Sequence, residues 1–332
     1  MRSGPSDRGI QARRVPVNWH EGLPIFASEP FLSSVSDESG WIGGMDDGGR
    51  LLCVLPYTVI RKAHIRLVRF RVATIPLTDD FSIADEKEFL NRAIDYLDSI
   101  RADIIIPATT NSIFRTYPDG AIAAPYGTFI VDLRQEEDAI WHNINHTYRK
   151  DINNASKKGV QVRVISGDVE KTYAVIRNTF KKSRLPFMNL GEFKRLLAGL
   201  GEHVRIFHAE FNGDLQSAAV FPFSQYCAYG VYGGSVPHGV PAAFKMIQWE
   251  AMKQFHEMGV QRLDFVGSRV NPEKGSKQEG IMLFKRHFGA EWVQGYIWKY
   301  PFSRWKYAAY RMATRFRSGG DIVDIEGHKL GG

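Results

Sequence analysis

The sequence predicts an α/β protein in which one mixed-sheet unit occurs twice along the chain. Its 332 residues exceed the roughly 100–200 residues of one ordinary domain. With 44% hydrophobic and 24% charged residues, the composition lies near that of globular proteins, so a large core can form. A succession of strand-like runs, a helix and a short apolar run also recurs at a nearly constant spacing.

The first copy begins with two strand-like runs, 51–60 and 64–75, which are rich in β-branched and aromatic residues. The turn-forming sequence at 46–49 precedes them, so we expect paired strands. Residues 85–100 place apolar side chains on one helical face, and the all-apolar run at 102–108 follows. This order predicts two strands, a helix and a buried strand.

The second copy repeats that order, with strand-like runs at 203–211, 215–223 and 227–234, a helix at 242–258 and a strand at 262–267. The turn Asn212-Gly213 between the first two runs is a strong hairpin signal. Leu51 and Leu215 lie 164 positions apart, and Ala93 and Ala251 lie 158 apart. The nearly equal offsets predict a duplicated unit.

The predicted boundaries follow from these patterns. We expect a disordered N-terminus at 1–20, a first domain at 21–134, a bridging helix at 135–159, a second domain at 160–301 and a basic amphipathic tail at 302–332. Apolar residues lie in one row of the bridging helix, and Gly159 is its predicted stop. The tail places Trp305, Met312 and Phe316 in one stripe among arginines. That stripe either lies on an anionic inner membrane face or packs against the second domain.

Charge and cysteine usage limit the partners and the compartment. A net charge of +7 favours anionic partners such as phosphates, nucleotides, RNA or an acidic membrane surface. Cys53 and Cys227 each lie in an apolar run, as buried thiols of a reducing compartment do. No apolar run reaches the roughly 18–20 residues that span a bilayer. We therefore expect a cytoplasmic protein.

The bridging helix carries two basic pairs, Arg149-Lys150 and Lys157-Lys158, about two turns apart. This spacing suits separate anionic groups of one extended ligand, and a solvated basic face is the alternative interpretation. His142 and His146 have the i, i+4 spacing of a metal pair. The Glu of an HExxH motif and a third ligand are missing, so we expect no metal site.

A glycine-containing loop at 231–244 leads from a strand into a helix. Backbone N–H groups at such a helix start attract phosphate, which makes Gly239, Ala242 and Ala243 candidates for binding the phosphate of a donor. An ordinary strand-to-helix turn is the alternative. Tyr232, at the start of this loop, is a candidate for substrate binding.

The segment 263–292 carries the candidate catalytic groups. Asp264 and Gly267 end a strand, and Phe284-Lys285 lie on the short helix that follows a polar loop. Loops after strands commonly line ligand clefts in α/β folds. In acyl transfer to an amine, Lys285 can stabilise oxyanion charge and Asp264 can accept the proton of the amine. A surface lysine and a strand-end cap are the alternative interpretations.

Together these motifs resemble the FemABX family. The resemblance covers 135–300 through the basic helix and Gly159, the Asn-Gly hairpin, the glycine loop, Asp-Phe-x-Gly at 264–267, and Phe284-Lys285 before Phe288-Gly289. It extends more loosely to the first half through Trp41, Gly43 and Leu55-Pro56. It implies two tandem GNAT-like domains, each a mixed β-sheet with flanking helices.

The resemblance also implies an activity, because the family includes enzymes that move amino acids from aminoacyl-tRNA to peptidoglycan precursors. It places Lys285 in the transfer site near the anionic end of the donor, with Phe284 and Gly267 beside it, and Arg149 and Lys150 in the groove between the domains. GNAT enzymes bind the CoA pyrophosphate at the glycine loop. Here Val236 and Pro241 occupy the outer positions, which usually hold Gln or Arg and Gly or Ala.

The predicted function is therefore acyl or aminoacyl transfer from acyl-CoA or aminoacyl-tRNA to an amine of a cell-envelope precursor, a peptidoglycan or a polysaccharide, without a tightly bound cofactor. No cysteine or serine has an evident base beside it, so we expect direct attack by the amine. One alternative is a GNAT-like protein without catalysis that binds an anionic polymer or scaffolds polysaccharide synthesis. A general RNA-binding module is another, favoured only by charge.

Overall fold

The computed structural model describes residues 9–62, 64–183 and 185–327. The strands are β1 (Gln11–Val15), β2 (Glu38–Met45), β3 (Leu51–Lys62), β4 (Ile65–Phe70), β5 (Ile75–Pro76), β6 (Ile104–Ile105), β7 (Ile122–Asp132), β8 (Gln161–Ile165), β9 (Val204–Phe211), β10 (Asp214–Pro222), β11 (Ala228–Tyr229), β12 (Tyr232–Ser235), β13 (Arg262–Asp264) and β14 (Glu291–Pro301). The α-helices are α1 (Glu29–Ser34), α2 (Ile83–Ser99), α3 (Glu137–Asn143), α4 (His146–Lys157), α5 (Val169–Lys182), α6 (Leu190–Leu200), α7 (Ala243–Glu257), α8 (Lys277–Arg286), α9 (Arg304–Ser318) and α10 (Ile322–Gly327).

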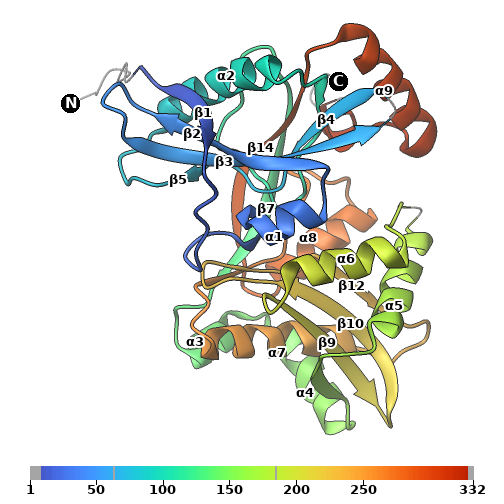
Figure 1. Ribbon diagram of the computed structural model, residues 1–332. Coiled ribbons are helices and arrows are strands. Elements are labelled where there is room, and N and C mark those ends of the chain that lie inside the picture. Colours follow the sequence, from blue (N-terminus) through green and yellow to red (C-terminus); the bar gives the residue numbers. More distant parts are fainter. Residues whose placement is uncertain (1–8, 63, 184, 328–332) are drawn as a thin grey trace.

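The two predicted copies have the same strand and helix order in the structure (Figure 1). In the first copy β3 pairs with β4, α2 follows, and β6 returns parallel to β4. In the second copy β9 pairs with β10, α7 follows, and β13 returns parallel to β11. Asn212 and Gly213 both have positive φ, as a tight hairpin turn requires. The duplicated α/β unit is thus confirmed.

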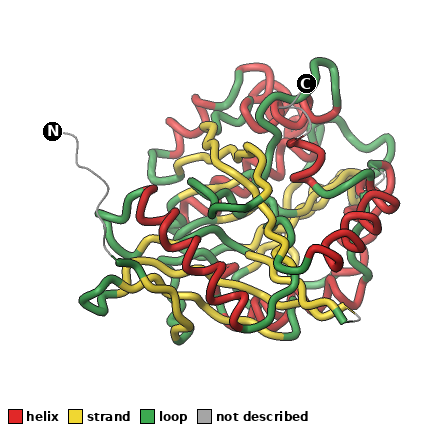
Figure 2. The backbone as a smooth tube through the Cα atoms, turned by 90° about the horizontal axis from the view of Figure 1, so that it is seen from above, coloured by secondary structure: helices red, strands yellow, loops and turns green. Residues whose placement is uncertain are grey.

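A long mixed sheet connects the two copies. Its strand order is β1-β2-β3-β4-β6-β14-β7-β13-β11, with β5 beside β3, whereas β12-β10-β9-β8 form a smaller sheet. Figure 2 shows strands through the middle of the molecule and helices toward the outside. The helix α2 packs its buried face, including Phe89 and Leu97, on the first copy. The helix α7 packs its buried face, including Ile247 and Phe255, on the second copy.

The pairing of the strand β14 differs from the expected domain boundary at residue 301. It pairs with β7 from Glu291 to Lys299, and its last residues, Tyr300 and Pro301, pair with β6 of the first copy. The strand β7 in turn pairs with β13 of the second copy. Residues 160–301 therefore do not form a separate unit, because their last strand completes the sheet of the first half.

The expected continuous helix at 135–159 is interrupted. It forms α3 and α4, with an extended residue, Ile144, between them. Asn145 caps α4 by accepting a hydrogen bond from the N–H of Thr147 at 2.9 Å, and its own N–H donates to the carbonyl of His287 at 2.8 Å. The apolar row stays buried through Ile140 and Ile152, because the break redirects the chain without exposing that face.

Both ends of the described chain also differ from the expectation. Residues 11–15, within the segment expected to be disordered, form β1 and pair with β2, because β2 would otherwise present an open edge. Residues 1–8 and 328–332 lie outside the described residues. After β14, the helix α9 packs on the first half and not on the second domain, through Tyr307, Tyr310 and the ion pair of Lys306 with Asp103. Cys53 and Cys227 are buried free thiols.

Candidate functional site

A cavity of about 530 Å³ opens in the second half, where the strand after β10 changes partners. Its first part, β11, pairs with β13 of the long sheet, and its second part, β12, pairs with β10 of the smaller sheet. The two sheets separate at Gly230, which lines the opening. We call this space the split-strand cavity. A slot between separating strands admits an elongated group that no close-packed sheet could hold.

Most of the walls of the split-strand cavity are apolar. Phe244 of α7 and Phe284 of α8 stack with ring centroids 5.8 Å apart, and Phe265 lies after β13. Tyr232 lines the cavity from β12, as does Gln248 from α7. Of the predicted substrate-binding residues, Phe284 and Tyr232 thus line this cavity. Its size and apolar walls suit an acyl chain or another slender organic group.

Lys285 supplies a cation to this apolar wall. Its side chain is 7% exposed, and its Nζ donates to the carbonyls of Val266 and Gly267, both at 2.6 Å. Burial lowers the pKa of Lys285 to about 8, and the negative charge of Asp264 opposes that shift. The alternative of a surface lysine is wrong for Lys285, because the residue is buried and lines the cavity.

Asp264 holds the turn that faces Lys285. It does not line the cavity. Its carboxylate accepts hydrogen bonds from the Thr128 hydroxyl and, at 2.7 Å, from the N–H of Val266. Burial raises the pKa of Asp264 to about 6. Val266 has a φ of 53°, which is rare for a β-branched residue. These contacts favour the interpretation of Asp264 as a strand-end cap over its interpretation as the proton acceptor. Asp264 still affects Lys285, because it holds the turn whose carbonyls accept the hydrogen bonds of Lys285.

Gly267 is part of that turn. A Cβ at this position would lie 2.5 Å from Cε1 of Tyr126 and 2.8 Å from the carbonyl oxygen of Thr110. Because such short distances to a Cβ do not occur, a side chain here requires the loop around Thr110 to move. The glycine therefore keeps the Lys285 acceptors in place.

The glycine loop joins β12 to α7, as the sequence predicted, but part of its backbone is already engaged. The N–H of Val240 donates to Oε1 of Gln216 at 3.0 Å, and the N–H of Ala243 donates to the carbonyl of Val240 at 3.2 Å. Ala242 has a left-handed φ of 67°. Because the N–H of Ala243 has an internal acceptor, Gly239 and Ala242 remain the candidates for donor phosphate at this helix start.

Arg149 and Lys150 lie away from the groove between the halves, which corrects their predicted position. They line a hollow of about 460 Å³ on α3 and α4, together with Trp141, His146 and Lys157. The helix α4 packs against α7, on the far side of the second half from β4 (Figure 1). The break at Asn145 directs their side chains to this outer surface.

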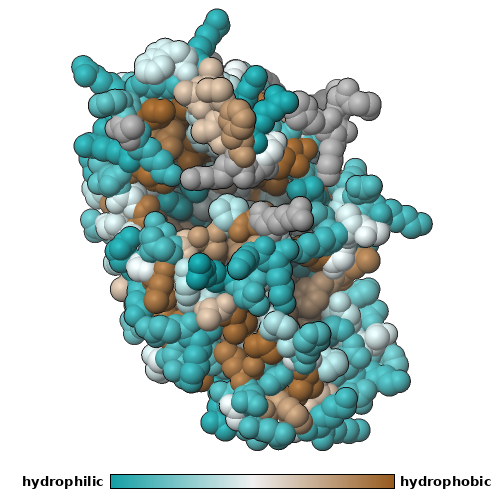
Figure 3. All heavy atoms as spheres, turned by 90° about the vertical axis from the view of Figure 1, so that its right-hand side faces the viewer, coloured by the Kyte–Doolittle hydropathy of each residue, from teal (hydrophilic) through white to brown (hydrophobic). Residues whose placement is uncertain are grey.

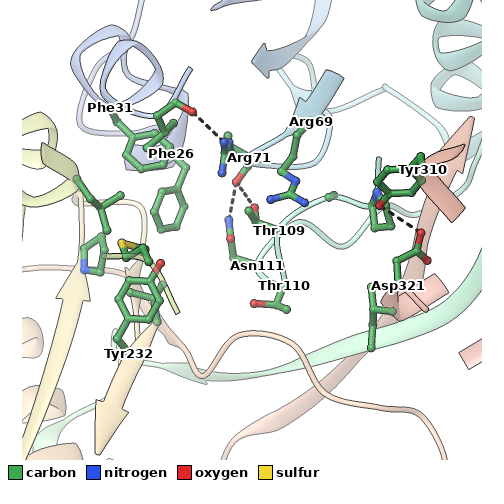
Figure 4. A pocket seen from close by; sticks show the side chains of 18 residues that line it. Phe26, Phe31, Arg69, Arg71, Thr109, Thr110, Asn111, Tyr232, Tyr310 and Asp321 are labelled. Atoms are coloured by element: carbon green, nitrogen blue, oxygen red, sulfur yellow. Dashed lines mark hydrogen bonds between the residues drawn. The ribbon is translucent and has the colours of Figure 1, made fainter. Parts of the chain in front are cut away.

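A second cavity, of about 410 Å³, lies between the halves and carries two arginines that are not among the predicted site residues. Arg69 of β4 and Arg71, directly after that strand, point into it, and Tyr232 reaches it from the second half (Figure 4). We call it the arginine cavity. The only sequence signal was three arginines, Arg66, Arg69 and Arg71, in the mostly apolar run 64–75. The prediction that this run forms a paired strand does not reveal which face of the strand lines a cavity.

Two further observations concern metals and membranes. Among the described residues, no cluster of His, Cys, Asp and Glu side chains is arranged to hold a metal ion. Within the same ranges, no helix combines the length and the apolar character needed to cross a bilayer.

Solved structures share this fold, although no family model and no curated protein matches the chain. The crystal structure of FemX aligns over 90% of this chain and 99% of its own, with a TM-score of 0.67 and 13% identity. The C-terminal domain of a putative lysylphosphatidylglycerol synthetase from Agrobacterium fabrum aligns over 90% and 94%, with a TM-score of 0.53 and 12% identity. A tandem GNAT protein from the clavulanic acid biosynthesis pathway aligns over 88% and 98%, with a TM-score of 0.50 and 13% identity.

These likenesses confirm the predicted tandem GNAT-like fold and, at the level of the fold, the resemblance to FemABX proteins. At 12–13% identity they concern the fold alone. One fold can carry different chemistries, so a function has to be argued from the side chains of the site.

Proposed function

We propose that this chain, which has the fold of FemX and of a tandem GNAT protein, transfers an acyl or aminoacyl group to an amine. The observation that carries the proposal is a buried cation, Lys285, at the wall of an apolar cavity between separating strands. An apolar slot suits the acyl end of a donor. A preorganised cation in a water-poor site stabilises the negative charge that develops on the attacked carbonyl oxygen.

The reaction joins an amine nitrogen to the carbonyl carbon of the donor. In the tetrahedral intermediate the carbonyl oxygen is negative, and the amine loses one proton to solvent or to a base. The bond from the carbonyl carbon to the donor sulfur of acyl-CoA, or to the donor oxygen of aminoacyl-tRNA, then breaks. The leaving sulfur or oxygen takes up one proton, which replaces the one that the amine has lost, so an amide and a free thiol or hydroxyl result without a covalent enzyme intermediate. Lys285 acts on the oxyanion and remains charged throughout.

We propose acyl-CoA or aminoacyl-tRNA as the donor and an amine of a cell-envelope precursor as the acceptor. Acetyl-CoA, aminoacylated tRNA and uncharged tRNA can be titrated into the protein by calorimetry. We expect saturable binding of one donor class and at least about ten-fold weaker binding to Lys285→Ala, because one charge-assisted contact is lost. Preference for aminoacylated over uncharged tRNA would identify the aminoacyl end as the recognised group.

Lys253→Ala is the matched control for that titration. Lys253 lies on α7, pairs with Glu250 of the same helix and does not line the split-strand cavity. Its replacement is expected to leave donor affinity within about two-fold of the wild type, since Lys253 is half-buried outside the cavity and a partly exposed ion pair contributes little. Absence of binding by every donor would contradict the transferase proposal and favour a binding protein without catalysis.

We further propose that α9 brings the protein to an anionic membrane surface, where a lipid-linked acceptor resides. Trp305, Met312 and Phe316 are 70%, 60% and 88% exposed. Their spacing of seven and four residues places them in one stripe, and exposed Arg311 and Arg315 lie on the same helix. Figure 3 faces the side of the molecule on which α9 lies in Figure 1. Exposed aromatic residues beside cations suit the headgroup region of a bilayer.

Vesicle sedimentation tests this placement. We expect binding to vesicles of phosphatidylcholine with phosphatidylglycerol, weaker binding to phosphatidylcholine alone, and at least about ten-fold weaker binding for Trp305→Ser/Phe316→Ser. Ile83→Ser is the control, because Ile83 is 55% exposed but lies on α2. If the double variant sediments like the wild type, α9 is not the membrane contact. If the wild type self-associates through α9 instead, the variant will change its mass in solution.

A further inference from the structure

The arginine cavity is built from both halves of the chain. Arg69, Arg71 and the loop at Thr110 come from the first half, and Tyr232 comes from the second. Phe26 and Phe31, before and within α1, add apolar walls (Figure 4). A volume of about 410 Å³ lies in the range of small-molecule sites. The cavity thus combines aromatic walls with two neighbouring cations.

The two guanidinium groups have no carboxylate partner among the described residues. Arg71 donates from Nε to the Thr58 hydroxyl at 3.2 Å and from NH2 to the carbonyl of Val35 at 3.1 Å. The Nε of Arg69 is buried, and no described residue accepts a hydrogen bond from it. Asp321, the acid that acts on Arg69 through its charge, also lines the cavity, but it is already paired with Lys299 at 2.9 Å.

Two like charges in this position oppose folding unless an anion offsets them. Removing a charge from water is costly when no partner replaces the water, and neighbouring like charges add to the cost. Burial and the charge of Arg69 lower the pKa of Arg71 to about 9, the direction expected for a cation without a counter-ion. A guanidinium group stays protonated at neutral pH nevertheless. Both positive charges therefore face the cavity under ordinary conditions.

We infer that the arginine cavity binds an oxyanion, a carboxylate or a phosphate, of a small organic molecule. The planar guanidinium group binds both kinds of oxyanion through two parallel hydrogen bonds. The Nε of Arg69 lacks an acceptor among the described residues, and Arg71 holds the second charge in place through Thr58 and Val35. The aromatic walls cover the rest of the ligand.

The position of this oxyanion site identifies its ligand as the acceptor, a step that rests on the proposed function. Tyr232 lines both the arginine cavity and the split-strand cavity. The carbonyl of Thr110 lies against Gly267, whose own carbonyl accepts the hydrogen bond of Lys285. An acceptor held at Arg69 and Arg71 thus lies next to the wall that carries the transfer site. The acceptor class is an amine that also bears a carboxylate or a phosphate.

Binding of simple anions tests the site without any turnover. Inorganic phosphate and acetate are titrated separately into the protein by calorimetry, with sodium chloride holding the ionic strength constant. We expect at least one of them to bind at millimolar concentration and to bind Arg69→Gln at least about ten-fold more weakly. Arg92→Gln is the control, because Arg92 lies exposed on α2 and outside the cavity, and it should bind like the wild type.

Phosphate binding alone would assign a phosphorylated acceptor, and acetate binding alone a carboxylic acid. Arg71→Lys keeps the charge but loses the planar fork, so it should also bind the anion more weakly. Binding of neither anion, or equal binding by Arg69→Gln and the wild type, overturns the inference. Lys285→Ala should bind the anion normally. A failure of donor binding is therefore distinguishable from a failure of the arginine cavity.

Discussion

Replacing Lys285 by Ala is expected to lower the rate of acyl transfer by about a hundred-fold or more, the usual cost of removing one oxyanion donor. The ammonium group is held in place before reaction by the carbonyls of Val266 and Gly267. It therefore needs no reorganisation when charge develops on the donor carbonyl. The rate can be measured as release of free CoA or uncharged tRNA, with a peptidoglycan precursor peptide that has a free side-chain amine as acceptor.

The pH dependence separates the charge of Lys285 from its packing. Burial lowers the pKa of Lys285 to about 8, so its charge is present below that pH and lost as the pH rises through it. The wild-type rate should accordingly fall above about pH 8, once the rise from deprotonation of the amine acceptor has been subtracted. The small residual rate of Lys285→Ala should lack this fall.

Stability measurements complete the Lys285 experiment. The variant leaves the carbonyls of the half-buried residues Val266 and Gly267 without this donor, at a cost of at most about 1–3 kcal/mol for each group. Rates therefore have to be compared below the unfolding transition of the variant, with Lys253→Ala as the lysine control. A folded Lys285→Ala protein that transfers at the wild-type rate would remove Lys285 from the mechanism.

Gly267→Ala is expected to destabilise the protein by about 1–3 kcal/mol, the usual cost of overpacking a closely packed position. The new methyl group would meet the main chain of Thr110 and the ring of Tyr126 at distances below 3.0 Å. The main chain of Thr110 cannot turn away as a flexible side chain can, so the turn from Asp264 to Gly267 has to shift. That shift moves the carbonyl acceptors of Lys285, and transfer should slow as well. Urea unfolding measures the free energy.

Gly280→Ala is the matched control for the stability of Gly267→Ala, but not for its transfer rate, because Gly280 lines the split-strand cavity. Gly280 lies inside α8, and a Cβ there would meet no atom within 4 Å. Alanine favours a helix interior over glycine by about 1 kcal/mol, so this variant should be slightly more stable than the wild type. The same chemical change thus has opposite expected signs at the two positions. Equal effects would contradict the packing argument for Gly267.

The repeated secondary structure could be predicted because its signals are local. The period of apolar residues separates α2 and α7 from the strands beside them, and Asn212-Gly213 specifies a tight turn. The break between α3 and α4 was missed, because Ile144 continues the apolar row of the expected helix. The change of direction is visible only in the structure, where the N–H of Asn145 donates to the carbonyl of His287. The strand β1 was missed because five residues at a sheet edge carry little apolar pattern.

The candidate site was predicted in part. Phe284-Lys285 and Asp-Phe-x-Gly are contiguous motifs, so the sequence alone identified the segment that lines the split-strand cavity. It did not show that Asp264 faces Thr128 instead of the cavity, or that Arg149 lies in another hollow. Those facts depend on which side of a strand or helix meets a neighbour that lies far away in the chain.

By itself the sequence determined the α/β class, the duplication and the motif around Lys285, because composition, period and short motifs are properties of neighbouring residues. Only the tertiary structure decided that β14 joins the halves, that α9 leaves Trp305 exposed, and that Arg69 and Arg71 share a cavity with Tyr232. Long-range strand pairing brings these groups together across more than a hundred residues. No local pattern records such pairing, because each strand is compatible with several partners.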